Sequence, residues 1–311
     1  NHHGQGAETI MRAEALFYQG HVTDAHIELE RAYAQVGGNG QINMALCCDF
    51  LSWRLSLHTD VERRYTFSER YAALLCYHDA SWINIWSATS AYYHALRGET
   101  DKIPEIFSQH RLSDIHLLAP GRPMMEMIEN QVYLAQGAYA KVVGRSAELL
   151  AACEAMHYAL VALHIRVQTA AAYARLGKPE TAHTWLQKAL SDAAPDGLVM
   201  PFAENYSLLK PLLARETRSA FAARITALGE AAQARGAERL RPAAFRALTA
   251  REFEIVELMA QRLSNREIAQ KCYLSEGSVK QYVNQIYSKL HIEGDTRTKR
   301  AQLAALLHEK T

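Results

Sequence analysis

Cysteine is scarce in this chain and forms no recognisable site. None of the five cysteines belongs to a C-x-x-C pair or has the spacing of metal ligands. An odd, scattered set of this kind is typical of reduced thiols in a cytoplasmic protein. Long apolar runs are also missing, so the sequence predicts no membrane-spanning helix. The five cysteines are Cys47, Cys48, Cys76, Cys153 and Cys272.

The motifs of several enzyme classes are absent. No G-x-x-x-x-G-K-[ST] loop occurs, which excludes a P-loop nucleotide site in this chain, and neither H-E-x-x-H nor G-x-S-x-G is found. The 14 histidines are scattered, and no carboxylate or cysteine joins His157 and His164 at ligand spacing. We therefore expect no catalysis, no cofactor and no metal site here. The chain begins at Asn1 without Met, and we expect the natural protein to continue upstream.

The remaining composition is that of a globular protein. The 311 residues are 49% hydrophobic and 22% charged, which allows about two domains with their own cores. The formal net charge is only +1, so overall charge does not indicate a polyanionic partner. Any specificity for such a partner has to come from where the charges are placed.

Glycines recur at a regular interval in the first two thirds of the chain. Gly98, Gly137 and Gly177 lie 39 and 40 residues apart, and Gly20 precedes Gly98 by twice 39 residues. Each glycine separates two runs with helical apolar periodicity. The missing turn is expected near residue 59, where His58–Asp60 takes the place of the glycine. This period predicts a repeated helical hairpin.

Each hairpin leaves an apolar face that only a neighbouring hairpin can cover. Glycine ends the first helix, and a small residue such as Ala25 or Ala182 allows the second helix to pack closely. Stacked hairpins then form a superhelix. The pattern resembles the tetratricopeptide class, with helices longer than those of its standard repeat of about 34 residues. An ordinary bundle of amphipathic helices is the alternative. We predict a repeat domain over residues 1–214.

Aromatic residues are concentrated in this repeat region. Trp82 and Trp86 share one face of a helix, and Tyr92 and Tyr93 follow them. These four residues are the candidate ligand site, because the inner face of a helical repeat commonly binds a ligand or peptide. Simple core packing is the alternative. After Gly197 the pattern changes, and residues 215–246 are expected to form one helix and a linker with Pro242.

Three helix-capping signals follow within a short distance. Thr249 precedes Glu252 and Ser264 precedes Glu267 at the spacing of a capping box. Ser275 is expected to cap a third helix after a turn of about three residues. Two short helices joined by a tight turn form a helix-turn-helix.

The third of these helices has two distinct faces. Its apolar stripe is Val279, Val283, Ile286 and Leu290. The opposite face is polar, and Lys280 has the chemistry to bind guanine while Gln281 and Asn284 have the chemistry to bind adenine in a major groove. A solvated surface is the alternative. This face consists of Gly277, Lys280, Gln281, Asn284 and Ser288.

Four motif pieces in this segment resemble the LuxR-type DNA-binding domain. They read LTARE, SNREIA, LS..SVK and IYSKL, within residues 248–290. The resemblance implies a four-helix fold with the third helix in the major groove. It also implies a dimer contact through a fourth helix, here around Thr296 to Glu309. Arg262 stands where the family usually has Gly, so the first turn is expected to differ.

The repeat region followed by this domain resembles the MalT-like large ATP-dependent regulators. That resemblance implies a nucleotide-binding module upstream of Asn1. We therefore predict an all-α, cytoplasmic transcription regulator with a repeat sensor at 1–214, a helix and linker at 215–246 and a DNA-binding domain at 247–311. Its expected partners are double-stranded DNA, a second copy of the chain on DNA, and a small-molecule inducer. The alternative is that a partner protein, bound by the repeat, controls the DNA-binding module.

Two groups of residues are predicted to contact DNA. Base contacts are assigned to Lys280, Gln281 and Asn284. The phosphate contacts, which position a protein on the duplex without reading its sequence, are assigned to Arg266, Lys271, Ser275, Ser278, Tyr282 and Lys289. The inducer, the operator and the sign of regulation do not follow from the sequence.

Overall fold

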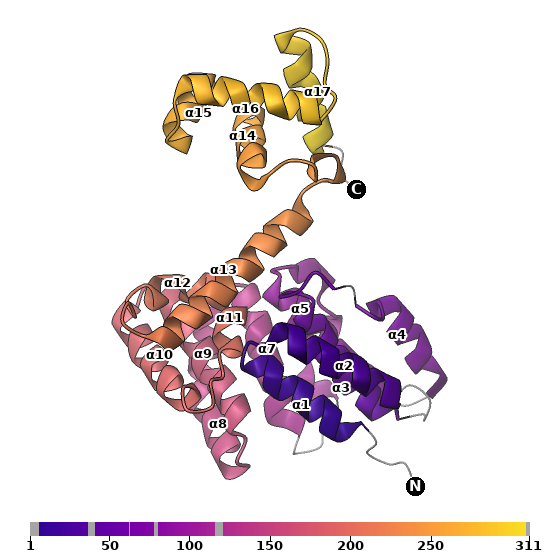
Figure 1. Ribbon diagram of the computed structural model, residues 1–311. Coiled ribbons are helices and arrows are strands. Elements are labelled where there is room, and N and C mark those ends of the chain that lie inside the picture. The colour runs from indigo at the N-terminus through magenta and orange to yellow at the C-terminus, as the bar shows by residue number, and fades with distance from the viewer. Residues whose placement is uncertain (1–5, 37–40, 62, 78–79, 116–120, 309–311) are drawn as a thin grey trace. The chain divides into compact units, whose positions relative to one another are not determined.

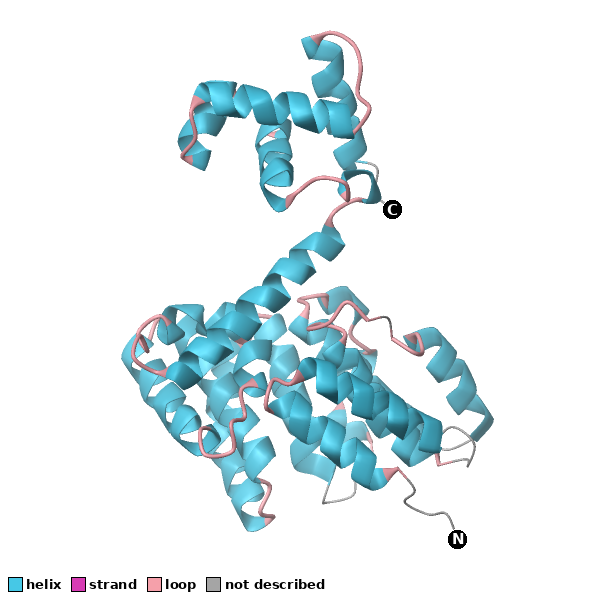
Figure 2. Ribbon diagram, viewed as in Figure 1, coloured by secondary structure: helices cyan, strands magenta, loops and turns pink. Residues whose placement is uncertain are grey.

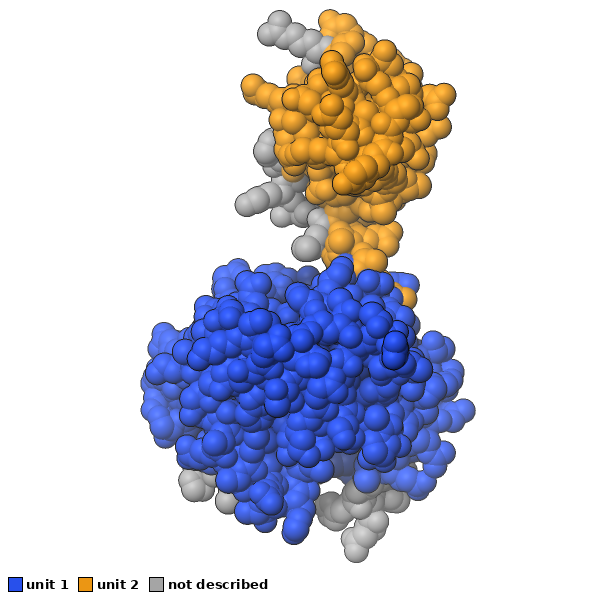
Figure 3. Space-filling model, turned by 90° about the vertical axis from the view of Figure 1, so that its left-hand side faces the viewer, with its two compact units in different colours: residues 1–233 blue, residues 234–311 orange. Residues whose placement is uncertain are grey.

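The computed structural model describes residues 6–36, 41–61, 63–77, 80–115 and 121–308. Within these ranges every regular element is a helix, which confirms the all-α prediction (Figure 2). The chain divides into two compact units, residues 1–233 and residues 234–311 (Figure 3). The division lies inside one continuous helix, α13 (Ala220–Leu240). No loop or change of composition marks it, and it falls between the expected boundaries at 214 and 246.

Figure 1 shows the order of the helices along the chain. The first unit contains α1 (Ala7–Tyr18), α2 (Val22–Val36), α3 (Ile42–Leu55), α4 (Phe67–Leu74), α5 (Ala80–Leu96), α6 (Glu105–Ser108), α7 (Arg122–Ala135), α8 (Tyr139–Ala155), α9 (Ala159–Arg175), α10 (Pro179–Ala193), α11 (Met200–Glu204) and α12 (Tyr206–Leu213). The second unit contains α14 (Ala250–Ala260), α15 (Asn265–Cys272), α16 (Glu276–Lys289) and α17 (Thr296–His308). In the described residues, no helix combines the length and apolar character needed to cross a membrane.

The predicted glycine turns are present. Gly20, Gly98, Gly137 and Gly177 all have positive φ angles, between 69° and 81°. At Gly20 the backbone closes with two hydrogen bonds, from Gly20 N–H to the Phe17 carbonyl at 2.8 Å and from His21 N–H to the Leu16 carbonyl at 2.9 Å. This is the Schellman arrangement that ends a helix. The same pair of bonds recurs at the other three glycines.

Two of the expected hairpins differ from the pattern. No described residue of His58–Asp60 has a left-handed backbone, and α4 starts only at Phe67, where Thr66 and Glu69 form a capping box. The chain thus turns near residue 59, as predicted, but without glycine the turn does not use the left-handed geometry. After Gly98, the second helix of the hairpin is reduced to the short helix α6, which begins directly after Pro104. Ala25 and Ala182 are fully buried, as predicted for the close packing of second helices.

The first helices of successive hairpins form a row that returns to its start. Helices α1, α3, α5, α7 and α9 each contact the next, and α11 contacts both α9 and α1. The Val199 N–H donates to the Tyr18 carbonyl at 2.8 Å where the last helices meet α1. A Cβ on Gly20 would lie 2.8 Å from Val199 and 2.7 Å from Leu228, so this approach needs a residue without a side chain. The stacking of the hairpins into a superhelix stays a prediction.

A fully enclosed ion pair joins the second helix of this row, α3, to the last, α11. Arg54 of α3 binds Glu204 of α11 through two parallel hydrogen bonds of 2.7 and 2.9 Å, and both side chains are almost inaccessible to solvent. Tyr18 accepts a further bond from Arg54 at 2.9 Å, and Tyr92 donates to Glu204 at 3.0 Å. The guanidinium also lies 4.7 Å from the centre of the Phe17 ring. A buried charge pair is tolerable when further hydrogen bonds of this kind support it.

His164 of α9 borders the same cluster. Its side chain is buried, and its Nδ1 lies 3.4 Å from the Tyr92 hydroxyl. Burial lowers the pKa of His164 from 6.5 to about 3, and the nearby Arg54 acts in the same direction. The imidazole is therefore neutral in the folded protein at physiological pH. In the unfolded chain the same imidazole binds a proton near pH 6.5. The contribution of His164 to the free energy of unfolding is therefore fully present above that pH and is lost as the pH falls toward 3.

We predict that His164→Gln weakens the acid sensitivity of the first unit. Between pH 7.5 and pH 5, the wild-type free energy of unfolding should lose up to about 1.4 kcal/mol per pH unit more than that of the variant. Urea unfolding followed by circular dichroism at several pH values measures this slope. The matched control is His21→Gln, because His21 is exposed and its replacement should leave the slope unchanged. Identical slopes for wild type and His164→Gln would contradict the prediction.

Candidate nucleic-acid interface

The three caps predicted for the second unit are all formed. The Thr249 hydroxyl accepts from the Glu252 N–H at 3.2 Å, and the Glu252 carboxylate accepts from the Thr249 N–H at 2.7 Å. Ser264 and Glu267 repeat this arrangement at the start of α15. The Ser275 hydroxyl accepts from the Ser278 N–H at 3.0 Å at the start of α16. Local side-chain chemistry thus fixes where α14, α15 and α16 begin.

Helices α15 and α16 pack on α14 and are joined by a tight turn, which is the predicted helix-turn-helix. Val279 and Ile286 are fully buried in the core of this unit, and Val283 and Leu290 are half-buried against it. Helix α17 starts at Thr296, as expected, while Glu309 lies outside the described residues. Leu303 of α17 is also buried in this core. A dimer contact through α17 stays a prediction.

Non-glycine residues in the left-handed region end three of these helices. They are Arg262, Tyr273 and His291, with φ angles of 63°, 54° and 53°. The Leu263 N–H donates to the Leu258 carbonyl, so the turn after α14 closes in the same way as the glycine turns of the first unit. Arg262 thus takes the conformation that glycine has in those turns. The chain accepts the conformational cost of a side chain there, which is about 1–2 kcal/mol per residue.

The polar face of α16 is free for an external partner. Lys280, Gln281 and Asn284 are exposed, on the side opposite Val279 and Ile286. Among the residues that the structure describes, none of these three side chains forms a hydrogen bond or an ion pair. Their donors and acceptors are therefore available in the first half of the helix. Gly277 and Ser288, the other two members of this face, are exposed as well.

The six predicted phosphate contacts lie in different surroundings. Arg266 and Lys271 of α15 are exposed and form no hydrogen bond or ion pair in the described part of the chain. The hydroxyl oxygens of Ser275 and Ser278 are 2.8 Å apart, so both hydroxyls are engaged in the cap of α16. Tyr282 is half-buried against the core of the unit. Arg266 and Lys271 are therefore more available to bind a phosphate than the two serine hydroxyls are.

Lys289, the sixth residue, has a second role in the fold. Its ammonium lies 2.8 Å from Glu252, whose side chain is only 3% exposed. Burial acts to raise the pKa of Glu252, but the Lys289 ammonium and the Thr249 cap outweigh it, and the pKa lies below its ordinary value. Lys289 therefore ties the end of α16 to the start of α14. A phosphate contact by Lys289 stays a prediction, and it would compete with this ion pair.

Two further residues of the second unit were not predicted from the sequence to have a role. Arg251 of α14 bonds the Cys272 carbonyl and the Glu254 carboxylate, so it links α14 to the end of α15. Tyr273 is 96% exposed in the turn between α15 and α16. Its position between the end of one helix and the Ser275 cap of the next is the signal that could have indicated a turn residue with an outward side chain.

The candidate ligand residues of the first unit separate into two pairs. Tyr92 is fully buried, and Tyr93 is buried with its hydroxyl 3.0 Å from Arg63. Trp82 and Trp86 are half-buried, and the Trp86 indole N–H donates to the Phe67 carbonyl at 3.1 Å. Trp86 also lines a cavity of about 580 Å³. A ligand contact by any of these four residues stays a prediction, and the two tryptophans are the more accessible of them.

Comparison with known proteins bears on the second unit. Residues 246–301 match the family described as bacterial regulatory proteins, luxR family. A stretch of 50 residues is 44% identical to the transcriptional regulatory protein LnrK of Bacillus subtilis (strain 168). The match covers 16% of this chain and 23% of that protein. No solved structure matches significantly. None of these findings bears on the MalT-like resemblance of the first unit, which stays a prediction.

We predict that Lys289→Ala loosens the packing of α16 on α14. Without its cation, the enclosed Glu252 carboxylate should lower the local stability by about 1 kcal/mol, the upper end of the range for a partly exposed ion pair. Amide hydrogen exchange of α14 and α16 in the full chain measures this loss. Lys280→Ala is the control, because Lys280 is exposed and unpaired on the same helix. Equal exchange rates in both variants would show that the Lys289–Glu252 pair contributes no stability.

Proposed function

Because the C-terminal unit is a LuxR-type helix-turn-helix domain, we propose that this chain binds double-stranded DNA and regulates transcription. The observation that supports this most directly is the unpaired polar face of α16 described above. In a helix-turn-helix the second helix enters the major groove, and the side chains in its N-terminal part read the base edges. The similar Bacillus subtilis protein is a transcriptional regulatory protein by name, which agrees with this proposal.

The three base-reading residues have complementary chemistry. Lys280 donates to the O6 and N7 atoms of guanine, and the amides of Gln281 and Asn284 form paired hydrogen bonds with adenine. All three are free of partners within the described protein, so no internal bond has to break before they bind a base. Gly277 adds no side chain at the start of α16, which leaves room for a close approach to the duplex. A merely solvated face is the competing explanation.

The phosphate contacts set the position of the helix in the groove. Arg266 and Lys271 lie on α15, the first helix of the motif, which crosses the DNA backbone in this docking mode. Their charges are not neutralised by ion pairs in the described residues. Such contacts supply affinity for any sequence and make binding depend on salt. Two copies of the chain on one operator would double this contribution, in agreement with the homodimer expected from the resemblance.

The first unit is the proposed sensor. Its repeat is all helical and closed by the Arg54–Glu204 pair, so a signal has to act through differential binding to two of its states. The primary proposal is a small-molecule inducer. The alternative is control by a partner protein, and screening the chain for thermal stabilisation by metabolites distinguishes the two, since a ligand that binds the folded state raises its stability.

We predict that Gln281→Ala and Asn284→Ala relax sequence discrimination. Each lost pair of base contacts should cost about 1–3 kcal/mol on the cognate duplex and little on a scrambled one. The cognate duplex is first selected from a random library with the wild-type chain. Fluorescence anisotropy then gives both affinities for each variant. Gln261→Ala, exposed at the end of α14, is the matched control. Equal losses on the two duplexes would refute base reading by these side chains.

We predict a different effect for Lys271→Ala. It should weaken binding to all sequences alike and reduce the slope of log affinity against log salt by about one unit, because one fewer phosphate is neutralised. A salt titration on cognate and scrambled duplexes measures both quantities. The charge-preserving variant Lys271→Arg should keep the slope. An unchanged slope for Lys271→Ala would assign this lysine to the solvated surface.

A further inference from the structure

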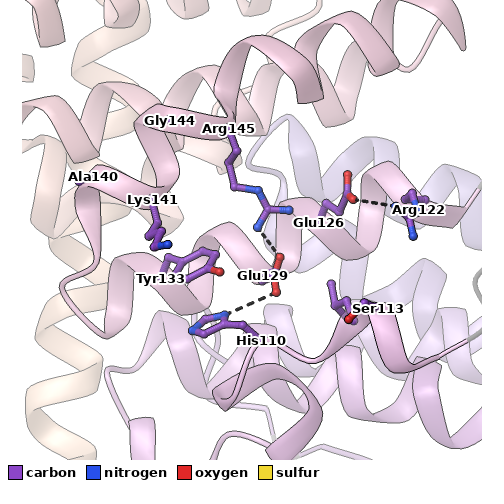
Figure 4. A pocket seen from close by; sticks show the side chains of 11 residues that line it. His110, Ser113, Arg122, Glu126, Glu129, Tyr133, Ala140, Lys141, Gly144 and Arg145 are labelled. Carbon is purple, nitrogen blue, oxygen red and sulfur yellow. Dashed lines mark hydrogen bonds and ion pairs between the residues drawn. The ribbon is translucent and has the colours of Figure 1, made fainter.

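A polar cavity of about 460 Å³ lies in the first unit between α7, α8 and the segment after α6. Helix α7 presents one face to it, with Arg122, Glu126, Glu129 and Tyr133 at helical spacing. Figure 4 shows Tyr133 of α7 beside Lys141 of α8 and Glu129 beside Arg145, with Glu126 and Arg122 further along α7. The volume is in the range of small-molecule sites. None of the candidate ligand residues named from the sequence lines it.

The cavity exists because α8 has small residues along one wall. Ala140 and Gly144 are four positions apart on the side that lines it. A Cβ at Gly144 would meet no atom within 4 Å, so the space in front of this helix is open. Gly144 is not in the left-handed region and does not end its helix. The backbone at this position would therefore accept any residue, and the effect of the glycine is to keep the wall of the cavity open.

The floor of the cavity is a rigid aromatic pair. The rings of His110 and Tyr133 stack with their centres 3.8 Å apart and their planes within 8°. Gln136 holds the His110 ring at Nε2 with a contact of 2.8 Å, and Glu129 lies 3.5 Å from Nδ1. His110 has a φ angle of 56°, which directs the chain back at the end of α6. This side of the cavity is therefore already ordered before any ligand enters.

The charges around the cavity do not cancel. Arg145 and His110 both contact Glu129, which is only 5% exposed (Figure 4). Arg122 makes a loose pair with Glu126 at 3.6 Å. Lys141 is exposed and forms no hydrogen bond or ion pair through its ammonium within the described residues. Three permanent cations thus face two carboxylates, and one of the cations has no counter-charge.

We propose that this cavity binds a small anionic molecule through a carboxylate or phosphate group held by Lys141. Lysine binds such groups with charge-assisted hydrogen bonds. The stacked His110–Tyr133 pair supports the less polar part of the ligand. Glu129 holds Arg145 and His110 in place and keeps the wall of the site ordered. This inference rests on the proposed function, since it gives the sensor unit a site and its ligand a chemical class.

The test uses the full 311-residue chain and two probes, inorganic phosphate and succinate. Isothermal titration calorimetry at constant ionic strength should detect saturable binding of at least one probe to the wild type. Lys141→Met should weaken that binding at least about tenfold, the loss expected for one hydrogen bond between charged groups. Gly144→Leu should abolish it, because the new side chain fills the cavity while improving the helix propensity of α8.

Lys188→Met is the matched control, because Lys188 is an exposed lysine of α10 that does not line the cavity. Its affinity should equal that of the wild type, and circular dichroism should show that all variants are folded. Binding of phosphate alone or succinate alone supports the site and identifies the group it prefers. The proposal is overturned if neither probe binds the wild type, or if Lys141→Met binds as tightly as the control.

DNA binding, measured in parallel by fluorescence anisotropy, separates this inference from the proposed function. If the chain binds DNA but neither probe, the cavity proposal fails and the proposed function stands. If the chain binds a probe but no DNA, the site is supported and the proposed function is contradicted.

Discussion

The first unit depends on the enclosed pair between Arg54 and Glu204. Neither charge could be buried alone, because an isolated ion in a protein interior is strongly destabilising. Tyr18 and Tyr92 each add one further hydrogen bond, and aromatic rings surround the guanidinium. Apolar helix faces tolerate some sliding, whereas two parallel hydrogen bonds require one geometry. The pair therefore specifies how α3 meets α11, and through α11 how the end of the repeat meets α1.

The second unit is organised by a different principle. Its helix starts are set by side chains no more than three positions away, through Thr249, Ser264 and Ser275. Its core is a small set of apolar residues, most of them from α14, α15, α16 and α17, and Lys289 and Glu252 add an ion pair between distant positions. Because so few internal contacts use the outer face of α16, that face can specialise in recognition without weakening the fold.

This contrast explains what could be predicted from the sequence. The caps, the glycine turns and the buried positions Val279 and Ile286 are local features, and all of them are present. The helix-turn-helix and its family followed from short motifs at fixed spacing. The broken arm after Gly98 and the long connection before α4 were not predicted, because packing overrode the period. The Arg54–Glu204 pair and the cavity beside Lys141 require side chains from distant segments, and a repeat pattern contains no information on which charges meet.

The separation of Arg54 and Glu204 along the chain has a consequence for synthesis on the ribosome. The two residues are 150 positions apart, so Arg54 emerges long before its partner exists. At typical translation rates of about 5–20 residues per second, the interval is roughly 8–30 seconds. During that time the early hairpins have to keep a guanidinium hydrated at a place that will later be dry. The native core of the unit can close only when α11 has been made, so its nascent form is one in which chaperones have time to act.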